Sequence, residues 1–393
     1  MQSISQVYFS LCGVLLAGLY GCGWQPHPVL SGTYSFGNAF DKTNITDSFC
    51  CYHDMEGRAA ILDYESMKTA PLCKKPNCRH TGDDCIVHRL NGQIPVFGDN
   101  CAYYFIDELP TIEQSADGLP DLALRSALYR YDFASNTEEK LMQWEGGAVS
   151  DPSCGMLLHN GTLYFMDSQL GRFYDDNGIL SSYINFGGDI RLHSVSLSDM
   201  KTTDLCDLLD IEKLAQYYPY ARNSGDVYMK GFYDNKIYFT IGFVDCINED
   251  NPSESALFRH YSTYYDLTDG QYYGEPADYG NIDFSDVLFC SGDYAVICKD
   301  NTLTVQKHGE SAPTEITDNA FYDDAELSVF DDMLFCEGKI FDLKMKTVRE
   351  ADALKSDDPI LPPKNVIAKY GNDYILCDET RSFEKIPAEQ LLK

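Results

Sequence analysis

A recurring unit of about 40 residues constrains the fold of this chain more than any other feature. In each unit, a short turn containing Asn, Asp or Gly precedes an apolar run of the length of a β-strand. The last three turns follow at this spacing, and the longer earlier steps indicate insertions. The turns and the strands expected after them are Asp99-Asn100 before 101–106, Asn160-Gly161 before 162–166, Asp234-Asn235 before 236–241, Gly292-Asp293 before 294–298, Asp331-Asp332 before 333–336, and Gly371-Asn372 before 373–377.

A second strand follows in several units and meets a polar turn, as in a β-hairpin. These strands are at 128–132, 193–197, 264–267 and 340–343, and an earlier unit begins at 59–64. A period of about 40 residues is what one four-stranded propeller blade uses. Stacking blades around an axis buries the faces and edges that a single blade leaves exposed. We therefore predict an all-β fold in which residues 34–393 form a single β-propeller domain.

Counting the units gives seven blades, although six or eight blades also fit the pattern. Helical signal is scarce, and the one segment that we expect to be a helix is 205–217, on an insertion. The chain is rich in aromatic residues, with 28 Tyr and 21 Phe. Flat side chains pack well on a pleated surface, so this composition also favours strands.

The formal net charge of −31 at pH 7 limits the partners of this protein. A surface this negative repels phosphate groups, which excludes nucleic acid and direct adsorption to anionic membranes. Cations and cationic ligands are better partners. We expect the protein to be a monomer.

The first 21 residues carry no Asp, Glu, Lys or Arg. Their apolar run is too short to cross a bilayer core of roughly 30 Å and is typical of a signal peptide. It ends in Leu19-Tyr20-Gly21-Cys22, which resembles a bacterial lipobox, in which the cysteine thiol takes a diacylglycerol and becomes the mature N-terminus. Ordinary secretory cleavage remains the alternative, because Tyr20 is bulky for its position.

These features predict where in the cell the protein is located. We expect a signal peptide over 1–21, lipid modification of Cys22 and a tether over 22–33, where two prolines in three residues prevent regular structure. The mature protein is then exported and held by its lipid at the outer face of the cytoplasmic membrane.

One loop, 72–88, concentrates chemically special residues. Cys73, Cys78, His80 and Cys85 form a C-x4-C-x-H-x4-C pattern, and three thiols with one imidazole suit tetrahedral zinc. A disulfide is the rival interpretation, because exported proteins meet oxidising surroundings. Inert thiols are the third possibility. With three thiols in the loop, a disulfide leaves one over, and Cys50-Cys51 is the nearest candidate partner.

The segment Leu72-Cys73-Lys74-Lys75-Pro76-Asn77-Cys78-Arg79-His80, followed by Cys85, resembles a family of propeller-like surface lipoproteins of Gram-positive anaerobes. Members carry Leu-Cys-x-x-Pro-Asn-Cys-x-His after their first hairpin. The close match covers roughly residues 50 to 90. The resemblance implies surface attachment and a propeller, and it implies no activity.

Other cysteines lie inside apolar runs, where a thiol behaves as a small buried hydrophobe. They are Cys290, Cys298, Cys336 and Cys377.

Motifs of catalysis are absent from the sequence: no Gly-x-Ser-x-Gly, His-Glu-x-x-His, P-loop or dinucleotide fingerprint occurs. We therefore expect a tethered recognition or scaffold protein that binds an extracellular glycan or protein. The Tyr-rich segments 217–220 and 272–273 offer stacking surfaces. The alternative is an extracellular polysaccharide hydrolase or lyase that uses loop residues around the propeller axis. Converging carboxylates and histidines on the axis would favour the enzyme.

Overall fold

The computed structural model describes most of the chain after residue 33. The described residues are 34–38, 43–73, 75, 77–82, 85–90, 95–107, 111–114, 120–123, 125–145, 155–168, 171–174, 180–184, 190–246, 256–274, 287–291, 294–299, 302–307, 310, 313–316, 327–356 and 360–393. The predicted signal peptide, Cys22 and the tether lie outside these ranges. Among the described residues, no helix has the length and apolar character needed to cross a membrane.

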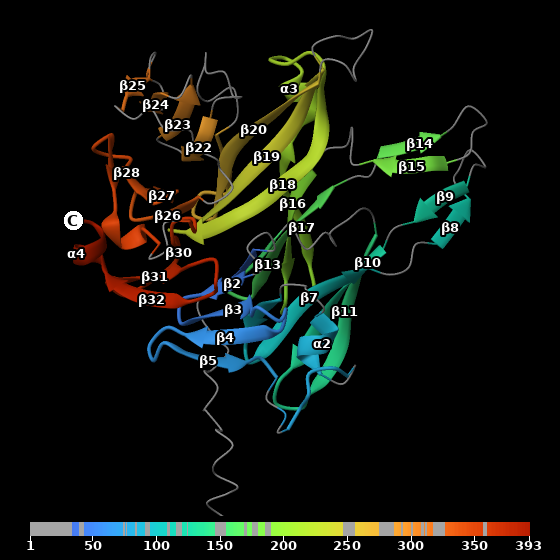
Figure 1. Ribbon diagram of the computed structural model, residues 1–393. Helices are drawn as coiled ribbons and strands as arrows, with labels where there is room; N and C mark the ends of the chain where they lie inside the picture. The colour runs from blue at the N-terminus through green and yellow to red at the C-terminus, as the bar shows by residue number, and fades with distance from the viewer. Residues whose placement is uncertain are drawn as a thin grey trace, which may run out of the picture.

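Antiparallel sheets dominate the structure (Figure 1). The largest has nine strands: β1 (Tyr34–Asn38), β2 (Thr43–Thr46), β3 (Phe49–His53), β4 (Ala59–Asp63), β5 (Lys68–Pro71), β12 (Met156–His159), β13 (Thr162–Ser168), β16 (Ile190–Ser196) and β17 (Thr202–Leu209). Their order is β17-β16-β13-β12-β1-β2-β3-β4-β5, so β1 joins two groups of four strands.

The remaining larger sheets each contain strands in an up-and-down order. The second sheet has β6 (Val96–Gly98), β7 (Cys101–Asp107), β10 (Arg125–Asp132) and β11 (Thr137–Glu145). The third has β18 (Ala221–Tyr233), β19 (Lys236–Cys246), β20 (Ala256–Asp266) and β21 (Gln271–Tyr273). The fourth has β22 (Val287–Ser291), β23 (Tyr294–Lys299), β24 (Thr302–Lys307) and β25 (Thr314–Glu315).

Two further sheets complete the C-terminal part. The fifth has β26 (Ser328–Phe330), β27 (Met333–Cys336), β28 (Lys339–Asp342) and β29 (Thr347–Glu350), and the sixth has β30 (Asn365–Tyr370), β31 (Asp373–Cys377) and β32 (Phe383–Pro387). Two-stranded ribbons pair β8 (Thr111–Gln114) with β9 (Pro120–Ala123) and β14 (Gly171–Tyr174) with β15 (Leu180–Ile184). The described helices are short: α2 (Ile86–Leu90), α3 (Ile211–Leu214), a 3-10 turn (Asp352–Leu354) and α4 (Ala388–Leu391).

Five of the six predicted turns are confirmed, and their backbone explains their composition; the sixth, Gly292-Asp293, lies outside the described residues. Asp99-Asn100, Asn160-Gly161, Asp234-Asn235 and Asp331-Asp332 each place two consecutive residues at positive φ. Such two-residue hairpins favour Asn, Asp and Gly, which tolerate the left-handed region. The six strands predicted after the turns are also confirmed, because β7, β13, β19, β23, β27 and β31 begin at the predicted residues.

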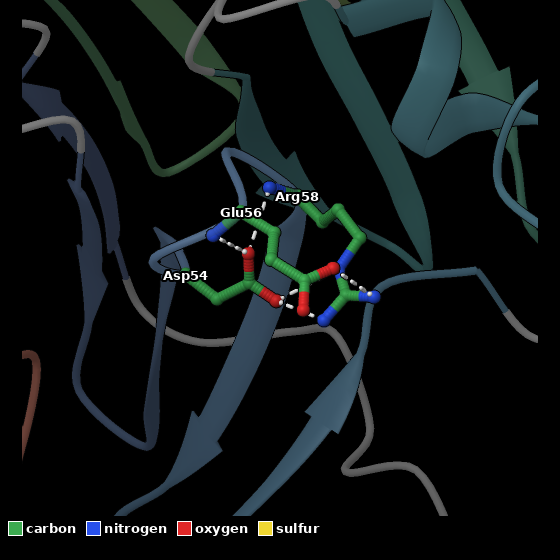
Figure 2. Close-up of polar contacts among 3 residues, drawn as sticks. All are labelled: Asp54, Glu56 and Arg58. Atoms are coloured by element: carbon green, nitrogen blue, oxygen red, sulfur yellow. Dashed lines mark hydrogen bonds and ion pairs between the residues drawn. The ribbon is translucent and has the colours of Figure 1, made fainter.

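Side chains close the turn between β3 and β4 (Figure 2). Asp54 Oδ1 accepts hydrogen bonds from the backbone nitrogens of Glu56 at 2.9 Å and Arg58 at 3.0 Å. Arg58 donates to Asp54 Oδ2 from Nε at 2.9 Å and Nη2 at 2.8 Å, and it pairs with Glu56. Burial alone would raise the pKa of Asp54, but the hydrogen bonds from Arg58 outweigh it and lower that pKa. The turn therefore favours the ionised carboxylate.

The predicted helix over 205–217 is wrong in its first half. Residues up to Leu209 belong to β17, which pairs with β16 from Ile190 onward, and only Ile211–Leu214 are helical. Cross-strand pairing here overrides a weak local preference for helix. Asp210 caps the short helix, because its Oδ1 accepts a hydrogen bond from Lys213 N at 2.9 Å.

The last sheet packs against the first. Ala368 and Ile375 share a buried cluster with Tyr64, and the rings of Tyr52 and Phe383 contact each other with centroids 4.7 Å apart. Figure 1 accordingly draws the red strands β31 and β32 beside the blue strands of the first sheet. The two ends of the described chain thus share one hydrophobic core.

Two of the cysteines predicted in apolar strands, Cys336 and Cys377, are buried and form no disulfide, as expected. The side chains of Cys290 and Cys298 lie outside the described part of the structure.

Candidate metal centre

The four predicted ligands lie in the connection between the first sheet and the second. Cys73 comes two residues after the end of β5, and Cys85 directly precedes α2. Cys78 and His80 occupy the loop between them. Leu72 N donates to Ala59 O at 3.0 Å, which anchors the start of the loop to β4.

The structure brings all four side chains together. Sγ of Cys73, Cys78 and Cys85 and a ring nitrogen of His80 all lie within 4.8 Å of one another. His80 Nδ1 lies 3.4 Å from Cys85 Sγ. The backbone nitrogen of His80 donates to Cys78 Sγ, also at 3.4 Å. One sulfur therefore has a backbone donor that stabilises a thiolate.

Local backbone geometry folds the loop inward. Asn77 and His80 both have positive φ, at 57° and 59°. A non-glycine residue in this region is uncommon, and for His80 the conformation turns the chain between Cys78 and Cys85. Cys78 N donates to Lys75 O at 3.3 Å. Backbone conformations of this kind cluster at functional sites such as ligand clamps.

The cluster is attached to a hydrophobic core. Cys73 is 7% exposed and Cys85 is fully buried, and both pack with residues of the first two sheets, such as Ile61 and Phe97. Leu90 of α2 belongs to the same core. The loop is therefore a joint between two sheets, and fixing it fixes their relative position.

Burial controls the protonation of the thiols. Burial, together with neighbouring sulfurs, raises the pKa of Cys73 to about 12. In the absence of a cation this thiol keeps its proton at neutral pH. Metal binding must therefore displace protons from the cluster.

The donor set fits a metal ion that prefers sulfur and nitrogen. With Zn–S near 2.3 Å and Zn–N near 2.0 Å, the ligand atoms of a tetrahedral site lie about 3.3–3.8 Å apart. The described cluster needs only small side-chain movements to reach that geometry. Among the residues that the structure describes, no other group of three or more His, Cys, Asp or Glu side chains converges in this way.

Nothing in the described structure supports the disulfide interpretation, because none of the nine cysteines whose side chains are described forms a disulfide bond. Cys51 shares the hydrophobic core of Cys73 and Cys85. Cys50 points to the opposite face of β3 and packs with the last sheet. The strand alternation therefore separates Cys50 from the loop. His88 is exposed on α2 and outside the cluster.

The Tyr-rich segments are only partly available for binding. Tyr217 and Tyr220 are 43% and 40% exposed. Tyr218 instead packs against the core, and Tyr272 donates from its hydroxyl to a backbone carbonyl oxygen at 2.8 Å. Tyr273 lines a cavity.

Sequence reasoning missed a buried histidine between two carboxylates. His193 on β16 lies 2.7 Å from Asp167 through Nε2 and 2.8 Å from Asp204 through Nδ1. Trp144 packs on its ring at a centroid distance of 4.8 Å. Burial alone would lower the pKa of His193, but the two carboxylates outweigh it and raise that pKa. Both ring nitrogens are engaged, so the arrangement suits a structural imidazolium. No local motif joins these three strands.

Comparison with known proteins finds only distant structural similarity to solved structures. No family model matches the chain, and no curated protein matches it. The structure is similar to the Pyrococcus horikoshii acylaminoacyl peptidase, with 12% identity, a TM-score of 0.32, and coverage of 88% of this chain and 49% of the peptidase. This chain spans about half the length of three peptidases that it matches, from 42% to 54%.

Two other similar structures are matched over most of their length. An oligogalacturonate lyase from Vibrio parahaemolyticus has 11% identity and a TM-score of 0.33, with 91% of this chain and 88% of the lyase covered. The β-propeller domain of Vanderwaltozyma polyspora Nup133 has 10% identity and a TM-score of 0.27, with 90% and 93% covered. Similarity at this level assigns no family and no activity.

Proposed function

We propose that this protein is an exported, lipid-anchored recognition or scaffold protein whose β-propeller is held together by a structural zinc ion. The observation that carries the proposal is the closed ligand set of Cys73, Cys78, His80 and Cys85. Structural zinc sites take all four ligands from the protein, whereas catalytic sites keep a position open for water or substrate. A closed site in a joint between sheets stabilises a rigid platform.

Seven blades are the architecture that we propose for this platform. Apart from β1, which joins two of these groups in one sheet, and the two ribbons, we divide the described strands into seven successive antiparallel groups: β2–β5; β6, β7, β10 and β11; β12, β13, β16 and β17; β18–β21; β22–β25; β26–β29; and β30–β32. The shared core of the first and last groups supports closure of residues 34–393 into one domain. An experimental structure with two separate domains, or an open stack with both end sheets exposed, would contradict this architecture.

The proposed location at the membrane depends on lipid modification of Cys22. Because one cysteine carries all the anchoring lipid, Cys22→Ala should move the protein from the membrane fraction to the medium. A variant that stays in the membrane fraction with its N-terminus unprocessed would overturn the lipoprotein assignment.

Binding of an extracellular glycan or protein is tested with the full mature chain. A glycan array and a cross-linking screen against surface proteins should give a saturable partner. The same preparation, incubated with acidic and neutral polysaccharides, should release neither new reducing ends nor unsaturated products. Depolymerisation of any substrate would overturn the binding role and support the hydrolase or lyase.

A further inference from the structure

A cavity of about 280 Å³ opens between the third and fifth sheets. Two equivalent turns border it, because Asp234 belongs to the turn before β19 and Asp332 to the turn before β27. The repeat therefore places the same acidic hairpin at both sides of one cavity. Its volume lies just below the range of about 300–1,000 Å³ for drug-sized ligands, so it accommodates one small group.

Tyrosines form a rigid wall of this cavity. Tyr264 and Tyr273 stack with centroids 5.0 Å apart and planes 18° from parallel, and Tyr238 lies 5.7 Å from Tyr264. The hydroxyl of Tyr273 donates to Asp269 Oδ2 at 2.5 Å, which orients its ring. The wall is thus organised before any ligand enters.

Carboxylates give the cavity a negative potential. Asp234, Asp266 and Asp332 line it, and of the described lining residues Lys236 alone is cationic. Lys236 Nζ lies 3.2 Å from Asp234 Oδ2 and 3.9 Å from Asp266 Oδ2. Burial raises the pKa of Tyr238, and the charges of Asp234 and Asp332 raise it further. The residues that line the cavity therefore favour a cationic ligand.

The lysine does not fully neutralise the site. Asp332 pairs with Lys344, whose side chain is 66% exposed. An exposed ion pair of this kind is weak, so a ligand cation can compete for Asp332. Lys236 itself shows that the cavity accepts an ammonium group beside two carboxylates.

The spacing of the carboxylates selects the kind of cation. In the described structure only the Cys/His cluster brings three ligand atoms close enough to hold a metal ion, and these aspartates do not converge in that way. An ammonium group on a short apolar chain is larger, donates three hydrogen bonds, and gains from aromatic faces through cation–π attraction.

We propose that this cavity is a binding site for an organic ammonium group, supplied by a free amine or by a lysine side chain of a partner protein. The inference rests on the proposed recognition function and names the chemistry that one of its sites accepts. The ammonium enters between the two acidic turns, its alkyl chain lies along the tyrosine wall, and Asp332 exchanges Lys344 for the ligand.

Isothermal titration calorimetry of the full chain at low salt tests the proposal. The probes are cadaverine, Nα-acetyl-lysine methylamide, its Nε-acetylated form and calcium chloride. Both amines should bind, and the neutral Nε-acetylated form should not. Tighter binding of cadaverine identifies a free amine as the source, and tighter binding of the lysine derivative identifies a protein. Heat from calcium chloride at the same site would overturn the proposal.

The variant is Asp234→Asn combined with Asp332→Asn. Asparagine occurs naturally in the equivalent turns, at Asn160 and Asn100, so the hairpins should still form. Affinity for the amines should fall roughly tenfold or more, because two of three carboxylates become neutral. The matched control is Asp99→Asn, an exposed first turn residue on another sheet, which should leave affinity unchanged.

Two results would overturn the proposal: no binding of either amine to the natural chain, or equal affinity in the double variant and the control. Failure here is separable from failure of the recognition function. If the glycan array or the cross-linking screen still gives a partner that the double variant also binds, the recognition function stands and this cavity has no part in it.

Discussion

Lys385 donates a hydrogen bond from Nζ to the backbone carbonyl oxygen of Tyr64 at 2.9 Å, across 321 positions of the chain. A second bond reaches the carbonyl oxygen of Glu65 at 3.1 Å. The ammonium also lies 5.5 Å from the ring centroid of Tyr370. The last sheet is therefore tied to the first through polar contacts as well as through a shared hydrophobic core.

Removing this contact should loosen the closure. Lys385→Met keeps the length of the side chain and loses both charged hydrogen bonds, so we expect the free energy of unfolding to fall by about 1–2 kcal/mol. Urea denaturation gives the value. The control is Lys355→Met, which removes exposed ion pairs with Asp352 and Glu350 and should change stability by less than about 0.5 kcal/mol. Equal effects of the two substitutions would show that the contact does not support closure.

The buried His193 should make stability depend on pH. Its folded-state pKa is raised above the usual 6.5, so its contribution is fully present below that pH and is lost as the pH rises through the folded pKa. The melting temperature should therefore fall over this window. In His193→Gln, the part of the decrease in melting temperature that is due to His193 should disappear. In His88→Gln, which changes an exposed histidine, the decrease should remain. An unchanged slope in His193→Gln would contradict the assignment.

Two glycines at positive φ should respond differently to alanine. Gly161 has φ of 71° with open space at its missing Cβ, so Gly161→Ala should cost about 1–2 kcal/mol from backbone strain alone. At Gly338, φ is 78° and an added Cβ would meet Pro363 at 3.2 Å, so Gly338→Ala should cost more. Thermal unfolding of both variants gives the comparison, and a smaller loss at Gly338 would contradict the packing described for that turn.

The sequence predicted the features that depend on neighbouring residues. Asp99-Asn100 and Asp234-Asn235 indicated hairpins because a left-handed turn restricts residue type locally. The Cys/His loop was likewise recognisable from its spacing. Residues 205–209, the second half of the strand Thr202–Leu209, were predicted as part of a helix because the pairing of this strand with β16 is not encoded in its own periodicity.

Sites formed by residues from different strands or sheets could not be predicted from local sequence patterns. Asp234 and Asp332 border one cavity although they belong to different sheets. Asp167 and His193 come from different strands, and their contact depends on the register that aligns β13 with β16. Such pairs follow from the fold, and the fold must be known first.

Replacing a cysteine of the Cys/His loop should affect the melting temperature more than replacing a comparable cysteine elsewhere. Cys78→Ser removes a metal ligand and should lower the melting temperature, because binding to the native state adds to folding free energy. Cys206→Ser changes another half-buried free thiol outside the cluster and should have a small effect. A chelator should destabilise the natural chain and leave Cys78→Ser nearly unaffected. Reductant-induced destabilisation of the natural chain would instead indicate a disulfide.

Native mass spectrometry of the chain, purified without reductant or chelator, tests the metal centre most directly. The account predicts one zinc ion per natural chain, one in Cys206→Ser, and none in Cys78→Ser. It also predicts that the zinc-bound mass is accompanied by the loss of thiol protons. A folded natural chain without metal, or one lighter by two hydrogens through a disulfide among Cys73, Cys78 and Cys85, would contradict the claim that zinc holds this loop.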